Sequence, residues 1–384
     1  MPFKLKDIDL SVVLILLAFL VISTMAVHSA TVNDPKFTNM AFKNLINYVI
    51  GFAVFFGISV LNYKPLIKAA LYFYIFGIVL LVSVLMFGQE INGAKSWFSI
   101  PIINFDFQPA EFVKILLIIA LAYFLARREG EPLHFVYDII PAFLIVALPF
   151  GLVMMQPDLG NAVIYIVITF GILWIANIRW QHVVIGLLTA ALFLGLFLFV
   201  YTKYHEPIVG FLQAQDKGHW AQRIDTFLYP DEVSADASYQ VENSMSAIGS
   251  GSFFGSGYLD GTLIQQNFVP YPYSDSIFVV IGEEFGFLGA VVIFLLYFAL
   301  IYRLLMIAHQ TEDLRGKYVI IGVIAMFVFQ VFENVGMLMG IMPLTGITLP
   351  FISYGGTSLF LNMLSLGLVM SIKMKTDDLP DNVV

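Results

Sequence analysis

Three carboxylates stand where a long polar segment of the chain gives way to an apolar one. They are Asp275, Glu283 and Glu284, and they lie within Val269–Gly289, VPYPYSDSIFVVIGEEFGFLG. A carboxylate near hydrocarbon costs at least about 2.5 kcal/mol on insertion scales, so such residues usually face a cavity, a partner or a substrate path. Any function assigned to the chain has to account for these three acids.

Two short motifs place further charges beside apolar runs. In QPAEFVK, residues 108–114, Glu111 and Lys114 are three apart and share one face of a helix that the proline would begin. They form either a structural ion pair or the polar floor of an outward-facing cavity. In QPDLGNA, residues 156–162, Asp158 could cap the following helix, hold a cation or line a cleft.

Two polar segments contain cations suited to a phosphate. Lys95 and Trp97 in NGAKSWF could bind a sugar phosphate, with the phosphate on the lysine and a pyranose face on the indole. Trp97 is equally explained as an anchor at the membrane interface. Arg223 in WAQRIDTFLYP suits a phosphate, or an ion pair with the neighbouring Asp225 or Asp231.

The stretch 331–358 carries the strongest signal, because Glu333 and Asn334 stand near the end of an apolar run that continues into glycines and prolines. This pattern predicts a non-helical connection that dips into the membrane, which is tolerated only against protein or a watery cavity. We count Ser353 among the substrate-binding candidates. The small residues of the stretch could instead serve close helix packing.

Composition sets the class of protein. The 384-residue chain is 59% hydrophobic and only 12% charged, with a net charge of -8, whereas soluble domains average about 25% charged residues. It has no cysteine, its six histidines are scattered, and it lacks basic patches for nucleic acid. We therefore expect an all-α integral membrane protein without a thiolate or histidine metal site and without a nucleic-acid partner.

Apolar runs near the length that a helix needs to cross a bilayer predict ten transmembrane helices. We place them at 10–30, 45–61, 69–87, 111–126, 137–155, 160–177, 183–202, 277–308, 318–341 and 354–372.

Ten spans put both termini on one side, and most of the 19 basic residues then lie on that side. The positive-inside rule makes it the cytoplasm. We expect one polytopic domain, 1–384, with two long extracytoplasmic segments. Residues 88–110 should lie along the interface, and the loop 203–276 between helices 7 and 8 should contain short helices. Its glycine-rich run, AIGSGSFFGSG, permits close backbone approach.

The residues by themselves indicate an outward-facing polar site, which fits either a transporter or an enzyme acting on a membrane-borne substrate. The chain also resembles the SEDS family (shape, elongation, division and sporulation) of bacterial peptidoglycan glycosyltransferases. The resemblance covers nearly the whole chain, and its motifs follow the family's order: NGAKSWF, QPAEFVK, QPDLGNA, RIDTFLYP, AIGSGSFFGSG, YSDSIFVVIGEEFGFLG and PLTGITLPFISYGGTS.

Two departures from the family pattern bear on the assignment. The family often has serine at the position of Ala110, and many members read His-Thr-Asp-Phe where this chain has Tyr273–Ser276. The aspartate itself is kept. The YSDS form and Thr348 look more like the rod-shape, RodA-type branch than the division, FtsW-type branch.

The resemblance implies that the chain polymerises lipid II into glycan strands on the outer face of the cytoplasmic membrane, with Asp275 as the catalytic general base. Substrate-binding roles are then expected for Lys95, Trp97, Glu111, Lys114, Asp158, Arg223, Glu283 and Ser353. The departing lipid pyrophosphate needs positive charge, from Lys95, Lys114 or Arg223 or from a bound divalent cation. The sequence leaves the metal requirement open.

The resemblance also implies a class B penicillin-binding protein transpeptidase as a partner, together with other membrane proteins of an elongation complex. Two other functions are compatible with the residues: a lipid II flippase or other transporter, and a scaffold that recruits cell-wall proteins.

Overall fold

The structure is a computed structural model that describes residues 8–34, 37, 39–91, 94–100, 105–214, 218, 221, 224–225, 228–229 and 235–376. Each predicted span coincides with a helix: α1 (Leu10–Thr31), α2 (Met40–Val60), α4 (Ala70–Phe87), α5 (Pro109–Leu125), α6 (Ile140–Met154), α7 (Leu159–Ile175), α8 (Trp180–Lys203), α13 (Ile277–Gln310), α14 (Leu314–Leu338) and α15 (Gly356–Thr376).

Among the described residues, nine helices are long and apolar enough to cross a membrane, and α7, with 17 residues, is a shorter apolar helix. The chain is therefore a multi-pass membrane protein, and the count of ten spans stays a prediction. Short helical elements fill some connections: α3 (Tyr63–Lys68), a 3-10 turn at Ala126–Arg128 and a π turn at Phe135–Ile139.

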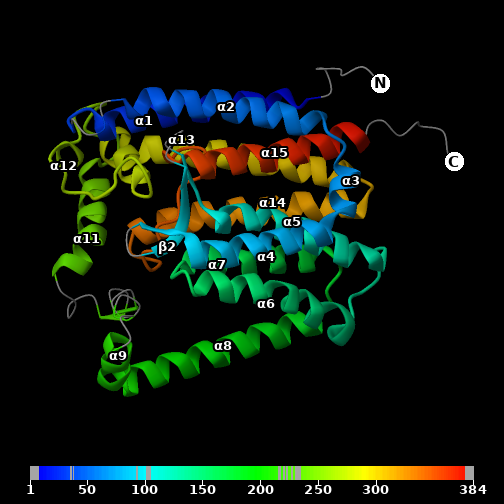
Figure 1. The fold of residues 1–384 in the computed structure, drawn as a ribbon. Coiled ribbons are helices and arrows are strands. Elements are labelled where there is room, and N and C mark those ends of the chain that lie inside the picture. Colours follow the sequence, from blue (N-terminus) through cyan, green and yellow to red (C-terminus); the bar gives the residue numbers. More distant parts are fainter. Residues whose placement is uncertain are drawn as a thin grey trace.

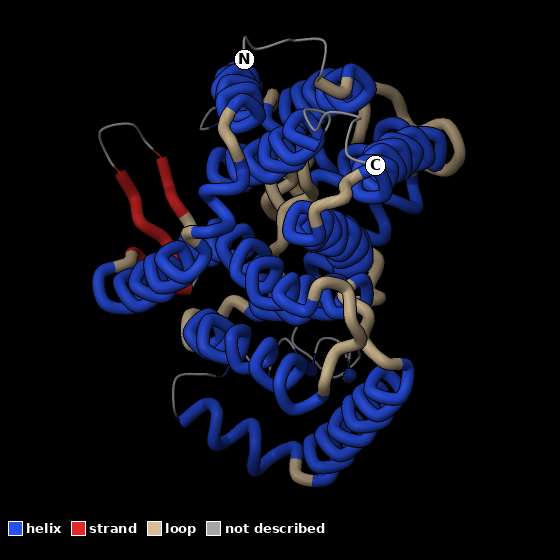
Figure 2. Tube along the Cα trace, turned by 90° about the vertical axis from the view of Figure 1, so that its right-hand side faces the viewer, coloured by secondary structure: helices blue, strands red, loops and turns tan. Residues whose placement is uncertain are grey.

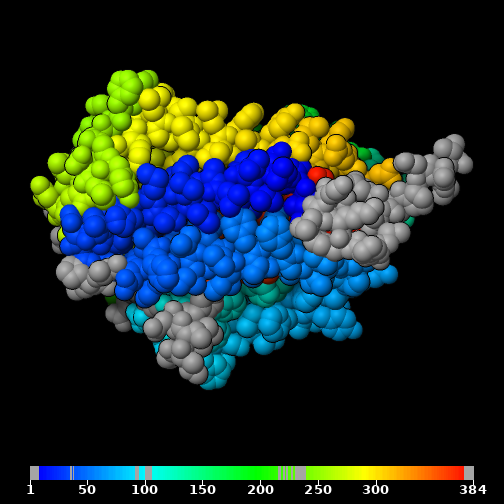
Figure 3. Space-filling view, turned by 90° about the horizontal axis from the view of Figure 1, so that it is seen from above, coloured from blue at the N-terminus to red at the C-terminus, as the bar shows by residue number. Residues whose placement is uncertain are grey.

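Helices α5, α14 and α15 form the centre of the bundle. Between 72% and 83% of their apolar windows are buried inside the protein, whereas α8 has none of its window buried and lies apart along one side (Figure 1). Helix α5 packs against α4, α7, α14 and α15. Figure 3 shows the surface on which α1 lies between α2 and α13. The polar residues that the central helices carry are thus enclosed by the helices around them.

The ends of the bundle differ. The start of α1 and the end of α15 lie at one end (Figure 1), while the opposite end carries α9 (His205–Ala214), α11 (Ala235–Ser250) and α12 (Thr262–Gln265). The loop 203–276 therefore contains short helices, as predicted. The first and last helices also share an end, as ten spans require, and the assignment of that end to the cytoplasm stays a prediction.

A small sheet, which the hydropathy pattern did not indicate, follows α4. Strands β1 (Gln89–Ile91), β2 (Ala94–Ile100) and β3 (Phe105–Phe107) pair antiparallel in the order β1-β2-β3. Figure 2 shows β1 and β2 projecting from the bundle as a hairpin. The aromatic residues that suggested an interfacial segment are also strong strand formers, so composition did not separate the two structures.

Helix α13 is interrupted at Gly286, whose φ of 62° is strained for other residues. The glycine-rich segment 251–257 lies against this break and supplies hydrogen bonds that the helix lacks: Ser256 N to Glu283 O (2.9 Å), Gly257 N to Glu284 O (3.0 Å), Phe287 N to Ser252 O (3.0 Å) and Leu288 N to Phe253 O (3.2 Å). A Cβ at Gly255 would overlap the Glu284 carbonyl oxygen. The prediction of close backbone approach is confirmed.

Residues 339–355 connect α14 to α15 without helical structure, as predicted, and re-enter the protein. Ile347, Leu349, Phe351 and Ile352 of this re-entrant segment are buried. Three of its successive carbonyl groups accept hydroxyl donors from three helices: Pro350 O from Tyr297, Phe351 O from Tyr48, and Ile352 O from Ser23. Such pairing is what allows irregular backbone inside a membrane protein.

Candidate active site

Asp275 lies in the non-helical segment that leads into α13. Its side chain is partly exposed, but its Oδ1 atom is buried and has no hydrogen-bond partner among the described residues. Burial raises the pKa of the Asp275 carboxyl to about 6, against the lowering effect of hydrogen bonds from the backbone of Asp275 and Ser276. A carboxylate with this pKa is largely ionised at neutral pH and can still take up a proton.

The segment around Asp275 is attached to α14 and to the re-entrant segment. The Asn334 side-chain Nδ2 donates to Asp275 O at 2.7 Å, and the Ser353 hydroxyl donates to Ser274 O at 2.7 Å. The Tyr354 amide donates to Tyr273 O at 2.9 Å. Ser353 thus contacts the main chain beside Asp275, and its predicted role in substrate binding stays a prediction.

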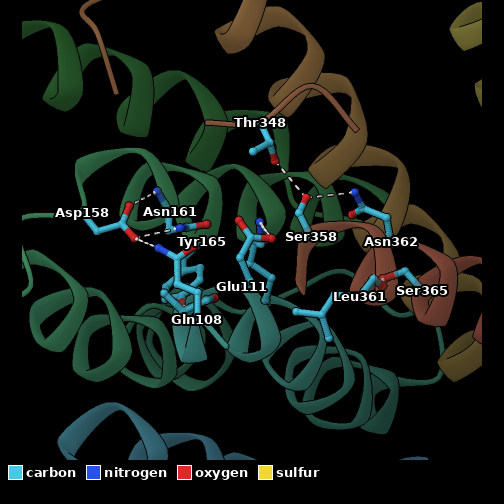
Figure 4. A network of polar contacts seen from close by, with 12 residues as sticks. Gln108, Glu111, Asp158, Asn161, Tyr165, Thr348, Ser358, Leu361, Asn362 and Ser365 are labelled. Atoms are coloured by element: carbon cyan, nitrogen blue, oxygen red, sulfur yellow. Dashed lines mark hydrogen bonds and ion pairs between the residues drawn. The ribbon is translucent and has the colours of Figure 1, made fainter. Parts of the chain in front are cut away.

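Glu111 and Lys114 form the ion pair that their spacing predicts. Lys114 Nζ lies 2.7 Å from Glu111 Oε2, and the exposed fractions of the two residues are 1% and 6%. The proline at position 109 opens α5 and places both side chains in its first turns. Because the pair is buried, removing either side chain would leave the other charge buried and uncompensated. Figure 4 shows Glu111 on this first part of α5.

Asp158 caps α7, as one of its predicted roles requires. Its carboxylate accepts hydrogen bonds from the Asn161 amide (3.1 Å), Asn161 Nδ2 (2.8 Å) and Gln108 Nε2 (2.8 Å), as Figure 4 shows. Burial raises the pKa of the Asp158 carboxyl; the Glu111 charge adds to this rise, and Lys114 and the Asn161 hydrogen bonds oppose it. Asp158 therefore shares one electrostatic environment with the buried ion pair.

The re-entrant segment joins this acidic group to Asp275. Gly160 of α7 packs against Thr345 and Ile347, and the Ile347 carbonyl accepts the second N–H of Asn334 at 2.7 Å. The neighbouring Thr348 hydroxyl pairs with Ser358 of α15 at 2.9 Å (Figure 4). The starts of α7, α13 and α15 thus meet around one segment, and the Gln108–Asp158 hydrogen bond joins the start of α5 to that of α7.

Lys95 and Trp97 lie on the small sheet. Ser96, between them on β2, is buried and donates to Gln156 O at 3.1 Å, so strand alternation turns Lys95 and Trp97 to the opposite face. Lys95 is exposed, and its Nζ donates to Met86 O at 3.1 Å. The contacts made by these two residues in the described part of the chain do not join them to Asp275.

Glu283 is buried in α13 and holds α12. Its carboxylate accepts from the Leu263 amide at 2.7 Å and the Ile264 amide at 3.0 Å. These contacts give it a structural task, and its substrate-binding role stays a prediction. Arg223 lies outside the described residues.

Several residues that shape the site were not among the predicted site residues. Ser23, Tyr48 and Tyr297 hold the re-entrant segment, and Asn334 holds both that segment and Asp275. All four are polar groups within apolar runs; that signal pointed to Asn334 in the sequence and could have identified the other three. Their partners lie far away in the sequence and could not be inferred from it.

The arrangement supplies a base with access to water, a buried cation in Lys114 and several buried acceptors. Within the described ranges, no group of three or more His, Cys, Asp or Glu residues is arranged to hold a metal ion. These side chains offer proton transfer by Asp275, beside a buried ion pair of Glu111 and Lys114.

Comparison with known proteins identifies the family. The family model described as FTSW_RODA_SPOVE, cell cycle protein, matches residues 7–378. The peptidoglycan glycosyltransferase RodA of Treponema pallidum (strain Nichols) is 31% identical, over 96% of this chain and 98% of the relative. The peptidoglycan glycosyltransferase MrdB of Escherichia coli (strain K12) is 32% identical, over 95% of this chain and 93% of the relative.

Solved structures agree. A structure described as structural coordination of polymerization and crosslinking by a peptidoglycan synthase complex has a TM-score of 0.80 and 28% identity, covering 97% of this chain and 99% of the other. The rod shape determining protein RodA of Thermus thermophilus has a TM-score of 0.69 and 27% identity, covering 96% and 97%. With its fold and its sequence matched over nearly their full length, the chain belongs to the FtsW/RodA/SpoVE family.

Proposed function

We propose that the chain is a peptidoglycan glycosyltransferase that polymerises lipid II during cell elongation. The relatives named RodA and MrdB, both peptidoglycan glycosyltransferases, match it over nearly their whole length. The observation that carries the proposal is the Asp275 carboxylate, which is partly exposed, has an unpartnered Oδ1 and has a pKa raised to about 6. These are the properties of a general base that works near neutral pH.

The proposed reaction is a single displacement at the anomeric carbon of the donor sugar. Asp275 takes the proton of the acceptor 4-hydroxyl as its oxygen forms a bond to that carbon. The bond from the carbon to the pyrophosphate oxygen breaks, and the lipid pyrophosphate leaves with the electron pair. Asp275 then returns the proton to solvent, and such proton transfer contributes typically 10²- to 10⁴-fold in rate.

The leaving pyrophosphate gains charge and needs a cation. Lys114, near the start of α5, is a buried cation that could supply this charge. Without substrate its charge is balanced by Glu111. We propose that the phosphates compete with Glu111 for Lys114, and that Lys95, Trp97, Asp158, Arg223 and Glu283 contact other parts of the substrate. A divalent cation would serve the same purpose as Lys114, so the assay includes a chelator.

We place the protein in the bacterial cytoplasmic membrane, with both termini in the cytoplasm. The end of the bundle that carries α11, α12 and Asp275 is then extracytoplasmic, where lipid II is polymerised. The structural neighbour is a peptidoglycan synthase complex of polymerisation and crosslinking. That likeness supports a class B penicillin-binding protein transpeptidase as the partner, together with other membrane proteins of elongation.

The test is glycan synthesis from lipid II by the purified protein, with and without its transpeptidase partner and with and without chelator. Wild type should form polymer, and Asp275→Asn should form none while eluting as the same folded species. Full polymer yield from Asp275→Asn would refute the role of Asp275. Translocation of lipid II across vesicles without polymer formation would favour a flippase.

A further inference from the structure

Three successive carbonyl groups of the non-helical segment before α13, those of Tyr273, Ser274 and Asp275, accept hydrogen bonds from one neighbouring region. Their donors are the Tyr354 amide at 2.9 Å, the Ser353 hydroxyl at 2.7 Å and the Asn334 Nδ2 at 2.7 Å. Bonds to three successive carbonyl groups restrict the main chain at Asp275, and with it the position of the Cα atom from which the side chain extends.

Two of the donors also hold the re-entrant segment. Asn334 Nδ2 donates to Ile347 O at 2.7 Å as well as to Asp275 O, and Ser353 Oγ accepts from the Leu349 amide at 2.8 Å as well as donating to Ser274 O. Because two carbonyls flank the Asn334 side chain, its amino group, and not its carbonyl, must face them. Each side chain therefore joins the Asp275 segment to the re-entrant segment.

Both side chains are shielded from water. Asn334 is fully buried and Ser353 is 7% exposed. Water cannot replace a lost hydrogen bond easily at such positions. Removing the Asn334 side chain takes a donor from two carbonyl groups. Removing the Ser353 side chain leaves the Leu349 amide without this acceptor and Ser274 O with the Ile277 amide at 3.4 Å. The segment would then shift or take in water, and the carboxylate would move with it.

From this geometry we infer that Asn334 and Ser353 are positioning residues that fix Asp275 against the re-entrant segment. The inference rests on the proposed role of Asp275 as the base. It assigns Ser353 a task different from substrate binding, and the two tasks affect kinetics differently. Loss of a positioning residue lowers kcat, whereas loss of a substrate contact used equally in ground and transition states raises KM.

The kinetic test uses paired variants. Ser353→Ala removes the hydroxyl and Ser353→Thr keeps it, while Asn334→Ala and Asn334→Asp remove the amino group. We expect Asn334→Ala, Asn334→Asp and Ser353→Ala to lower kcat for polymerisation of lipid II by about 10- to 100-fold, with KM within about twofold, since small misplacements cost up to about 100-fold. Ser353→Thr should recover most of kcat.

Matched controls separate positioning from loss of folding. Ser365→Ala removes another buried hydroxyl, which donates to Leu361 O at 2.8 Å within α15. Gln330→Ala removes a fully buried amide one turn before Asn334. Both controls should keep kcat. Equal losses of kcat in the controls and in the Asn334 and Ser353 variants, or a raised KM with unchanged kcat for Ser353→Ala, would overturn the inference.

A second measurement does not depend on activity. The chain contains no cysteine, so Ser274→Cys provides a single thiol beside Asp275. Asn334→Ala should raise the rate at which a water-soluble maleimide labels this thiol by at least about fivefold, and Gln330→Ala should not. Unchanged labelling would overturn the inference even if Asp275→Asn is inactive. If Asp275→Asn still polymerises lipid II while Asn334→Ala labels faster, Asp275 is not the base. The inference that Asn334 holds the Asp275 segment against the re-entrant segment would still stand.

Discussion

Replacing Asp275 by asparagine should abolish polymerisation and, at the same time, stabilise the protein. Burial raises the pKa of the carboxyl from 3.8 to about 6 because the folded protein disfavours the ionised form. The folded state therefore binds the proton more tightly than the unfolded state does. Between these two pKa values stability falls as pH rises, and above pH 6 the full loss remains.

The magnitude follows from the shift. A change of roughly 2 units at about 1.36 kcal/mol each makes ionised Asp275 cost about 3 kcal/mol of unfolding free energy at pH 8. At pH 4 the folded carboxyl is protonated, and the cost is below about 1 kcal/mol. Asparagine has nearly the same shape and does not ionise. Asp275→Asn should therefore unfold roughly 3–4 °C above wild type at pH 8 and close to it at pH 4.

The assay is thermal unfolding of the two proteins in one detergent at both pH values, with the midpoint difference compared between pH values so that other titrating groups cancel. Ser365→Ala serves as the control, since it removes a buried polar group without a charge. A pH-independent difference, or a variant less stable than wild type at pH 8, would refute the reasoning that burial of this carboxylate is unfavourable. It would also remove the physical basis for a base with a pKa near 6.

Three other outcomes follow from the structure. The kcat/KM of wild type should rise about tenfold for each pH unit below about 6 and level off above it, because Asp275 acts when ionised; a flat profile would contradict this. Lys114→Met should lower the unfolding free energy by about 3–5 kcal/mol by leaving Glu111 uncompensated, and the double variant with Glu111→Gln should be less destabilised in thermal unfolding. Gly255→Ala should greatly reduce the yield of folded protein, because the added Cβ would overlap the Glu284 carbonyl oxygen. Gly249→Ala should not, because its Cβ meets no atom within 4 Å. Equal yields would argue that the break in α13 does not need the close approach of segment 251–257.

The membrane-spanning helices could be predicted because length and apolarity are local properties of the sequence. The largest difference is at α2, which begins at Met40 and not at residue 45. Asn44 lies inside this helix, where its side chain is buried and donates to Ser23 Oγ at 2.9 Å. A polar residue with a partner on another helix does not end a span, and the sequence does not show the partner.

In the candidate site, too, the features set by local spacing could be predicted and those set by distant contacts could not. The Glu111–Lys114 pair and the Asp158 cap depend on spacings of three residues and were predictable. The side of β2 on which Lys95 and Trp97 lie depends on strand pairing in a segment not expected to form strands. The contact between Asn334 and Asp275 joins residues 59 apart in the sequence, and nothing local indicates it.

The structure also explains how one residue can be both reachable and partly desolvated. A base on a regular helix would have its carbonyls paired within that helix, whereas residues 273–275 receive donors from α14 and the re-entrant segment. That segment is in turn held by Ser23, Tyr48 and Tyr297, from α1, α2 and α13. Residues 273–275, at the end of the loop 203–276, are therefore held by hydrogen bonds to the core of the bundle.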